Sequence, residues 1–230
     1  MRICVNNVIL SYEKVGEGSP LMLVHGSGED HRVFDRAVEI LRKHFTCFLI
    51  DSRGHGGSSR VSEFHYRDMA VDMVEFMDRL NLSDVTYVGF SDGGIIGLMA
   101  AAMSSRIRRL FVCSANTVPH GLTEIFLYIL KVINYFLRSP RLRLLIEEPD
   151  IQDWELQNIT ADTVVTAGSR DLIKRSHTDH IARQIPGAVE VILKGQTHTS
   201  YVVHSDLIAR LVCSHLKLSD EPLPEAVRIR

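Results

Sequence analysis

Short apolar runs alternate along the chain with longer segments whose apolar residues recur every three to four positions. The short runs are typical of buried β-strands, and the longer segments are typical of amphipathic helices. The predicted strands cover residues 3–5, 8–15, 21–24, 46–50, 85–90, 107–113, 163–167 and 189–193. The predicted helices cover residues 33–44, 66–80, 95–103, 123–138, 176–184 and 200–216. This alternation predicts repeated β-α-β units, and therefore an α/β fold with a mostly parallel sheet and helices on both faces.

Three glycine-rich loops follow predicted strands, directly after Val24, Ile50 and Phe90. The carboxyl ends of parallel strands meet at one edge of a sheet, so we expect these loops to lie together. The sequence therefore places a functional site at this edge.

The third loop contains Gly89-Phe90-Ser91-Asp92-Gly93, a G-x-S-x-G pattern between a β-prone run and a wholly apolar segment. A serine that attacks a substrate must project from a very tight turn, which leaves no room for side chains two positions away on either side. Ser91 is therefore the candidate nucleophile.

A serine hydroxyl needs a histidine that takes its proton and an acid that orients the histidine. Asp171 and His198 each follow a predicted strand, and the order Ser91, Asp171, His198 is typical of a nucleophile between a strand and a helix. Asp162 and Asp179 are alternatives for the acid. His177 and His180 share a helix face, but no third residue at a matching spacing completes a metal site, so we expect no metal.

These motifs give the chain a resemblance to the α/β-hydrolase family from about Ile9 to Leu216. His25-Gly26-Ser27-Gly28 resembles the oxyanion loop of that family, and Asp51-x-Arg53-Gly54-x-Gly56-x-Ser58 resembles the loop after its fourth strand. The resemblance implies an oxyanion hole formed by the backbone N–H groups of Ser27 and Asp92. We expect Arg53 to support loop structure rather than to react.

The form G-x-S-D-G-G is similar to that of the valacyclovir hydrolase group, whose members cleave amino-acid esters. The resemblance implies that the Asp92 side chain binds an amino group of the substrate. A carboxylate next to the nucleophile can pair with an ammonium, but it can also cap the helix or bind a neighbouring loop.

The segment from Asn116 to about residue 156 corresponds to the cap insertion of the family, and it is short here. Its predicted helix is strongly apolar, so we expect Phe126 and Ile129 to line a pocket for apolar substrate groups. The same helix could instead pack on the core or against a second subunit, which makes a homodimer possible. A lipid-binding helix would carry more lysine and arginine on its polar face.

Length and composition narrow the function further. With 230 residues, we expect a single domain over residues 1–230 that includes the cap at about 116–156. The net charge of −2 gives no reason to expect a nucleic acid or an anionic membrane as partner. The N-terminal residues lack the apolar run of a signal peptide, and no segment is long and apolar enough for a stable membrane insertion, so a cytoplasmic location is expected.

The remaining expectations concern the cysteines, the tail and the reaction. Four scattered cysteines favour buried, reduced thiols, and residues 220–230 are expected to fray. The predicted function is a serine esterase without cofactors that hydrolyses a small or medium-sized carboxylic ester, possibly an α-amino ester, through an acyl-enzyme. The alternatives are hydrolysis of a carbon–carbon, thioester or lactone bond by the same triad, or a ligand receptor without catalysis.

Overall fold

The computed structural model of the chain describes residues 1–218 and 226–229, and its strands form one twisted sheet. The strands are β1 Arg2–Val5, β2 Val8–Val15, β3 Ser19–Val24, β4 Phe45–Ile50, β5 Val85–Phe90, β6 Ile107–Cys113, β7 Asp162–Arg170, β8 Val189–Thr197 and β9 Ala226–Ile229. Their order across the sheet is β1-β2-β4-β3-β5-β6-β7-β8-β9. The strands β3 to β8 are parallel to one another, while β1, β2 and β9 pair antiparallel with their neighbours. The predicted α/β fold is therefore confirmed.

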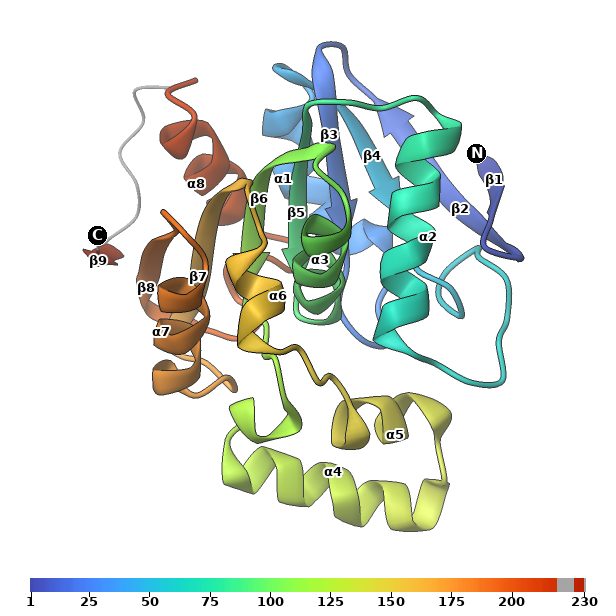
Figure 1. Cartoon of the computed structure of the whole chain (residues 1–230), viewed down its shortest axis with the longest axis vertical. Coiled ribbons are helices and arrows are strands. Elements are labelled where there is room, and N and C mark those ends of the chain that lie inside the picture. The colour runs from blue at the N-terminus through green and yellow to red at the C-terminus, as the bar shows by residue number, and fades with distance from the viewer. Residues whose placement is uncertain (219–225, 230) are drawn as a thin grey trace.

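Two apolar cores cover the two faces of the sheet (Figure 1). On one face, α1 Asp35–Leu41 and α8 Leu207–His215 pack against the inward side chains of the central strands. On the other face lie α2 Tyr66–Arg79, α3 Asp92–Met103, α6 Asp153–Gln157 and α7 Arg175–Gln184. All six residues of β5 are buried, as expected for a central parallel strand covered on both sides.

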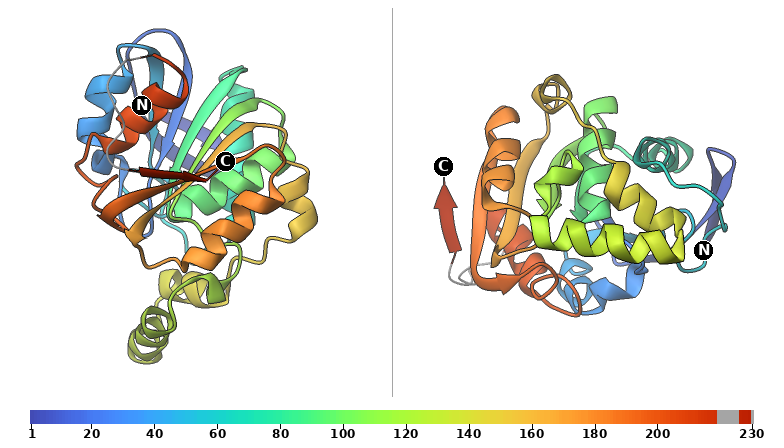
Figure 2. Two further views of the ribbon diagram at one scale, coloured as in Figure 1. Left: turned by 90° about the vertical axis from the view of Figure 1, so that its left-hand side faces the viewer. Right: turned by 90° about the horizontal axis from the view of Figure 1, so that it is seen from below.

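Two further helices, α4 Glu124–Leu137 and α5 Pro140–Glu147, project from the body at the carboxyl ends of the strands (Figures 1 and 2). Both helices lie in the segment expected as a cap, and they share a small apolar cluster that includes Leu127, Leu130, Leu142 and Leu145. Leu144 of α5 belongs instead to the apolar core of the body. Backbone hydrogen bonds join the cap to the body, from Thr123 N to Leu172 O and from Lys174 N to Gly121 O, both at 2.8 Å.

Three expectations differ from the structure. The segment predicted as a helix over 200–216 is helical only from Leu207, because His204 adopts a left-handed φ of 50° that interrupts the preceding turn. Within the tail that was expected to fray, residues 226–229 pair with β8 instead, while residues 219–225 and 230 lie outside the described part. All four cysteines are free, but Cys4 is exposed rather than buried because it lies on an edge strand.

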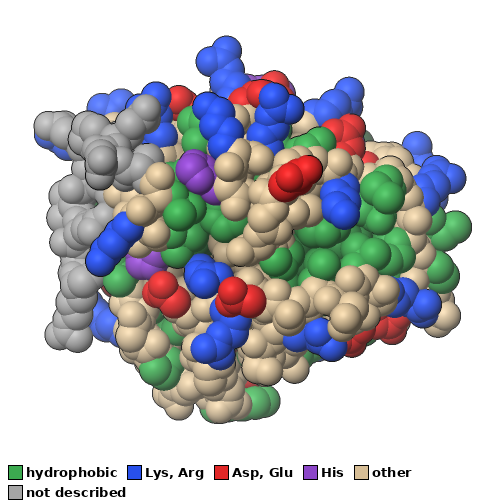
Figure 3. Space-filling model, turned by 90° about the horizontal axis from the view of Figure 1, so that it is seen from above, with side chains coloured by type: hydrophobic (Ala, Val, Ile, Leu, Met, Phe, Trp, Pro, Cys, Tyr) green, Lys and Arg blue, Asp and Glu red, His purple; other side chains and the backbone are tan. Residues whose placement is uncertain are grey.

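The surface opposite the cap carries acidic and basic side chains that are interspersed (Figure 3). In the described part of the chain, no helix combines the length and the apolar character needed to cross a bilayer.

Candidate active site

The turn between β5 and α3 holds Ser91 in a strained backbone conformation, with φ 53° and ψ −114°. The glycines on either side make this turn possible. A Cβ at Gly89 would lie 2.1 Å from the Gly93 carbonyl oxygen, and a Cβ at Gly93 would lie 2.0 Å from the Val24 carbonyl oxygen. The sequence therefore folds into a turn that lifts Ser91 out of the sheet at the N-terminus of α3.

The structure brings the three residues of the expected triad together. His198 Nε2 lies 3.1 Å from Ser91 Oγ, and His198 Nδ1 lies 2.7 Å from Asp171 Oδ1. The ring of His198 also packs against Phe90, with 5.2 Å between the ring centroids. These distances are those of a serine, a base and an orienting acid joined by hydrogen bonds.

Asp171 is held by further donors. Its Oδ2 accepts hydrogen bonds from Ser114 Oγ at 2.6 Å and from Gly168 N at 3.0 Å, and its Oδ1 accepts one from Ile173 N at 3.0 Å. Burial acts to raise the pKa of this carboxyl, but the hydrogen bonds from His198, Ser114 and Ile173 hold the pKa below its ordinary value. Asp171 is therefore an ionised partner for the imidazole at neutral pH.

Ser27 and Asp92, whose N–H groups are expected to form the oxyanion hole, line the same cavity as Ser91. Neither the Ser27 N–H nor the Asp92 N–H has a hydrogen-bond acceptor among the residues that the structure describes, so both remain available to a ligand. The first loop is fixed by two buried histidines. His25 Nε2 accepts a hydrogen bond from Ser52 N at 3.1 Å, and His55 Nε2 accepts one from Gly28 N at 3.1 Å.

A cavity of about 200 Å³ opens at Ser91. Its lining comprises Gly26, Ser27, Glu29, Phe90, Ser91, Asp92, Asn116, Leu122, Phe126, Leu145, Leu172, His198 and Thr199. The aliphatic and aromatic side chains form an apolar wall, and two carboxylic acids contribute the charge. The cavity is thus suited to a small ligand with an apolar portion and a cationic group.

Asp92 is one of these acids, and its side chain is buried. Its Oδ1 accepts a hydrogen bond from the Tyr66 hydroxyl at 2.8 Å, whereas its Oδ2 has no partner within hydrogen-bond geometry in the described part of the chain. Burial raises the pKa of Asp92 to about 6, and the hydrogen bond from the Tyr66 hydroxyl opposes this rise. The side chain thus bonds a neighbouring helix through one oxygen and leaves the other oxygen unsatisfied.

Glu29 is the second acid, and the sequence did not indicate it. Its Oε2 accepts a hydrogen bond from Gly26 N at 3.1 Å. A Cβ at Gly26 would lie 2.9 Å from this oxygen and 3.1 Å from Ser91 Cβ, so the carboxyl group lies close to the serine. Burial raises the pKa of Glu29, and the nearby Asp92 raises it further. Glu29 directly follows the His25–Gly28 loop in the sequence, and no motif distinguishes it from an ordinary acidic loop residue.

Of the remaining residues that the sequence offered as candidates, only one lies at the cavity. Phe126 lies in the cavity wall, but Ile129 is 45% exposed and is absent from the lining, because it is turned about 60° around α4 from Phe126, toward the solvent side of the helix. Asp179 forms an ion pair with Arg175 on α7, and Asp162 pairs with His215, so neither contacts His198.

The histidine pair on α7 has structural partners. His177 Nε2 accepts a hydrogen bond from Thr117 N at 2.9 Å, and His180 Nε2 lies 2.8 Å from Asp153 Oδ1. Elsewhere in the described residues, Asp30, His31 and Asp51 approach one another. Asp51 already accepts hydrogen bonds from the backbone and ring of His31 and from Gly57 N, so this cluster links two loops.

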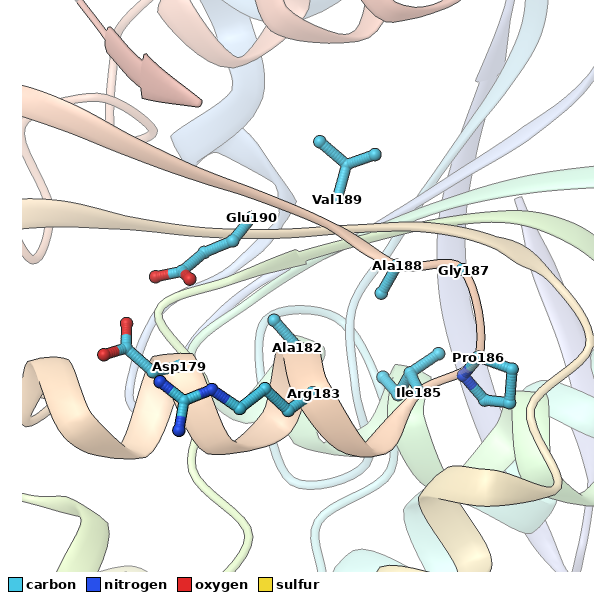
Figure 4. A pocket seen from close by; sticks show the side chains of 9 residues that line it. All are labelled: Asp179, Ala182, Arg183, Ile185, Pro186, Gly187, Ala188, Val189 and Glu190. Carbon is cyan, nitrogen blue, oxygen red and sulfur yellow. The ribbon is translucent and has the colours of Figure 1, made fainter. Parts of the chain in front are cut away.

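A larger cavity, of about 610 Å³, lies between α7 and the start of β8 (Figure 4). It is lined by residues such as Arg183, Pro186 and Glu190, and by no member of the triad. The chemistry described above is therefore confined to the smaller cavity at Ser91.

Known proteins resemble this chain in sequence and in fold. A family profile described as alpha/beta hydrolase fold matches residues 19–146. The mouse (Mus musculus) protein named serine hydrolase BPHL is 26% identical over 246 residues, covering 92% of this chain and 84% of that protein. The human (Homo sapiens) protein of the same name is 28% identical, covering 91% and 84%.

Solved structures share the architecture. An esterase from Thermogutta terrifontis superposes with a TM-score of 0.80 at 19% identity, covering 95% of this chain and 98% of that one. At this identity the likeness shows the fold alone. Because the family profile matches more than half of the sequence, the chain belongs to the alpha/beta hydrolase fold family.

Proposed function

We propose that this protein is a serine hydrolase that cleaves small carboxylic esters through an acyl-enzyme. The observation that carries the proposal is the hydrogen-bonded series Ser91, His198 and Asp171 at the floor of a cavity. The relatives named serine hydrolases and esterases support hydrolysis as the reaction class.

In this mechanism, Ser91 Oγ attacks the ester carbonyl carbon while His198 Nε2 takes the hydroxyl proton. Asp171 orients the imidazole and stabilises its charged form. The carbonyl electron pair moves to oxygen, where the N–H groups of Ser27 and Asp92 donate hydrogen bonds. The intermediate collapses and expels the alcohol, which takes the proton from His198. Water then attacks the acyl-enzyme by the same route and releases the acid and Ser91.

The cavity supports a short acyl group as substrate. Its volume of about 200 Å³ is below the roughly 300–1,000 Å³ typical of sites for drug-sized ligands. Leu122, Phe126 and Leu145 supply apolar contacts from the cap side.

The two acids support an α-amino ester within this class. An ammonium beside the scissile carbonyl would lie near two carboxylates, Asp92 and Glu29, in a largely buried cavity that strengthens the attraction between opposite charges. The unsatisfied Oδ2 of Asp92 would gain a donor in the same step.

Steady-state hydrolysis of p-nitrophenyl esters of increasing chain length tests the reaction. We expect turnover of the short esters, and a loss of at least about a thousandfold in kcat for Ser91→Ala. Thioester and lactone substrates in the same panel distinguish the bond type. Tight ligand binding without turnover would instead identify a receptor.

The α-amino preference is tested with an amino-acid ester and its analogue lacking the amino group. We expect the native enzyme to prefer the amino ester, and Asp92→Asn to lose that preference. Asp153→Asn, a change at an exposed acid on α6, serves as the control and should keep the preference. An equal preference in the native enzyme and in Asp92→Asn would contradict the assignment.

A further inference from the structure

Helix α4 presents an apolar face to solvent, which the hydrolase mechanism does not use. Its exposed large side chains are Ile125, Tyr128, Ile129, Val132, Ile133, Tyr135, Phe136 and Leu137. Tyr135, Phe136 and Ile125 are 78%, 76% and 75% exposed. Figure 2 shows α4 as the outermost element at this end of the molecule, so the body does not cover this face.

The two sides of α4 differ in their surroundings. Leu127 and Leu130 are buried against the cap cluster, about 180° around the helix from Ile125 and Val132. The charged residues of the helix, Glu124 and Lys131, lie together on one flank, and Glu124 pairs with Lys174. The outward face is therefore uncharged over its whole length.

The exposed residues along the centre of this face have the spacing of a coiled-coil seam. Ile125, Ile129, Val132 and Phe136 follow one another at intervals of four, three and four residues. If a second α4 is placed antiparallel about the point between Leu130 and Lys131, Ile125 faces Phe136 and Ile129 faces Val132. A two-fold axis at this point therefore pairs the seam with itself.

The exposed apolar area of this face is at least as large as the area that a stable dimer buries on each chain. With ordinary side-chain areas and the exposed fractions above, the eight residues expose roughly 1,000 Å² per chain. The largest apolar patch on a typical monomer is about 300–600 Å². A stable interface of standard size buries about 800 Å² on each partner.

We propose that the protein forms a two-fold dimer in which α4 packs antiparallel against α4 of a second copy. This inference goes beyond the proposed function and does not depend on it. Phe126, on the same helix, lines the cavity at Ser91, so the dimer would also hold the cap over the active site.

A lipid membrane is the other partner that could cover the apolar face of α4. Helices that lie in a bilayer interface carry a polar face rich in lysine and arginine. Within α4 the only basic residue is Lys131. The seam spacing and the presence of a single basic residue in α4 both favour a second copy.

Sedimentation velocity of the full chain, over a hundredfold range up to about 100 µM, tests the proposal. We expect a dimer for the native protein and a monomer for Ile129→Glu/Phe136→Glu. Both positions are solvent-exposed in one copy, so circular dichroism of the variant should show an unchanged fold. Trp154→Glu, which replaces another large exposed apolar residue, is the matched control and should remain dimeric.

The register is tested by oxidation in a Cys4→Ser background. Ile129→Cys/Val132→Cys should form a disulfide-linked dimer, and Ile125→Cys/Val132→Cys should not, because Ile125 faces Phe136 in the proposed pairing. A native monomer at the highest concentration would overturn the proposal, as would a dimer that persists in Ile129→Glu/Phe136→Glu. A native monomer that co-floats with phosphatidylcholine vesicles would also overturn it and would identify a lipid surface as the occupant.

Discussion

The Tyr66 hydroxyl donates a 2.8 Å hydrogen bond to Asp92 Oδ1, and both side chains are buried beneath the candidate active site. Burial raises the pKa of Asp92 to about 6, and the hydrogen bond from Tyr66 opposes that rise. Tyr66 thus helps to keep Asp92 ionised at neutral pH. An aspartate in this state can bind an ammonium, whereas a protonated one cannot.

Tyr66→Phe should therefore move the preference for α-amino esters to higher pH. In the native enzyme we expect the ratio of kcat/KM for the amino ester to that for its analogue to fall as the pH drops through about 6, because Asp92 takes up a proton. Without the hydroxyl the pKa of Asp92 rises further, so the same fall should occur at higher pH. The ratio measured from pH 5 to about 8 in both enzymes checks this.

Tyr87→Phe is the matched control for that experiment. The Tyr87 hydroxyl is also buried and donates to the Gly93 carbonyl oxygen at 3.1 Å, next to the serine turn, but it does not touch Asp92. Its removal should leave the pH midpoint of the ratio in place. If both variants shift the midpoint equally, the change reflects packing and not the Tyr66 to Asp92 hydrogen bond.

His25 should make the free energy of unfolding depend on pH. Burial lowers its pKa from 6.5 to about 4, so the unfolded chain binds a proton between these values that the folded chain excludes. Stability is therefore complete above about pH 6.5 and falls as the pH drops toward 4, by about 3 kcal/mol at most from this group.

Urea unfolding at several pH values checks the contribution of His25. His25→Asn should lower stability at pH 7, because the hydrogen bond from Ser52 N is weakened, but its stability should fall less on acidification. His177, whose pKa is also lowered to about 4 by burial, adds a second contribution that His177→Asn removes separately. An unchanged pH dependence in His25→Asn would contradict this account.

Arg53 and Asp72 form a buried, bidentate ion pair, with N–O distances of 2.7 and 2.6 Å. Asp72→Asn should destabilise the protein by about 3–5 kcal/mol, because it leaves the buried guanidinium with only the half-exposed Asp68, at 3.4 Å, as an opposite charge. Asp84→Asn makes the same chemical change in the exposed pair with Arg109, and should cost about 1 kcal/mol or less. Equal effects in urea unfolding would show that burial does not decide the strength of these pairs.

Much of this arrangement could be predicted from the sequence, because each strand is a short apolar run followed by a distinctive loop. The order of Ser91, Asp171 and His198 in the sequence predicts that the three act together, and the structure joins them by hydrogen bonds. Arg53 was expected to support a loop, and it bonds Asp72 on α2.

Contacts between distant segments could not be predicted in the same way. Tyr66 lies at the start of α2 and reaches Asp92 across 26 residues, and no local pattern marks that pairing. The periodicity of α4 indicated an apolar helix but not which side faces the body, so Ile129 was assigned to the cavity although it faces solvent. Residues 200–204 were likewise expected to be helical, but they form turns. The buried Tyr201 in this segment forms a hydrogen bond with Ser114 through its hydroxyl.

Asp171→Asn should lower kcat by about 10³–10⁴ with little change in KM, because an amide does not stabilise the charged imidazole. Ser114→Ala, which removes one donor to Asp171 Oδ2 and leaves two backbone donors, should have a much smaller effect. Kinetics with a short p-nitrophenyl ester checks both. Equal losses would indicate that the variants disturb the loop rather than the charge of Asp171.

The most direct test of the central claim is stoichiometric labelling with a fluorophosphonate, followed by peptide mapping. We predict one phosphonyl group per chain on Ser91, with loss of esterase activity in proportion to labelling, and no labelling of Ser91→Ala or of heat-unfolded protein. Failure of the native protein to react, or labelling at another serine with activity retained, would contradict the assignment of Ser91 as the nucleophile.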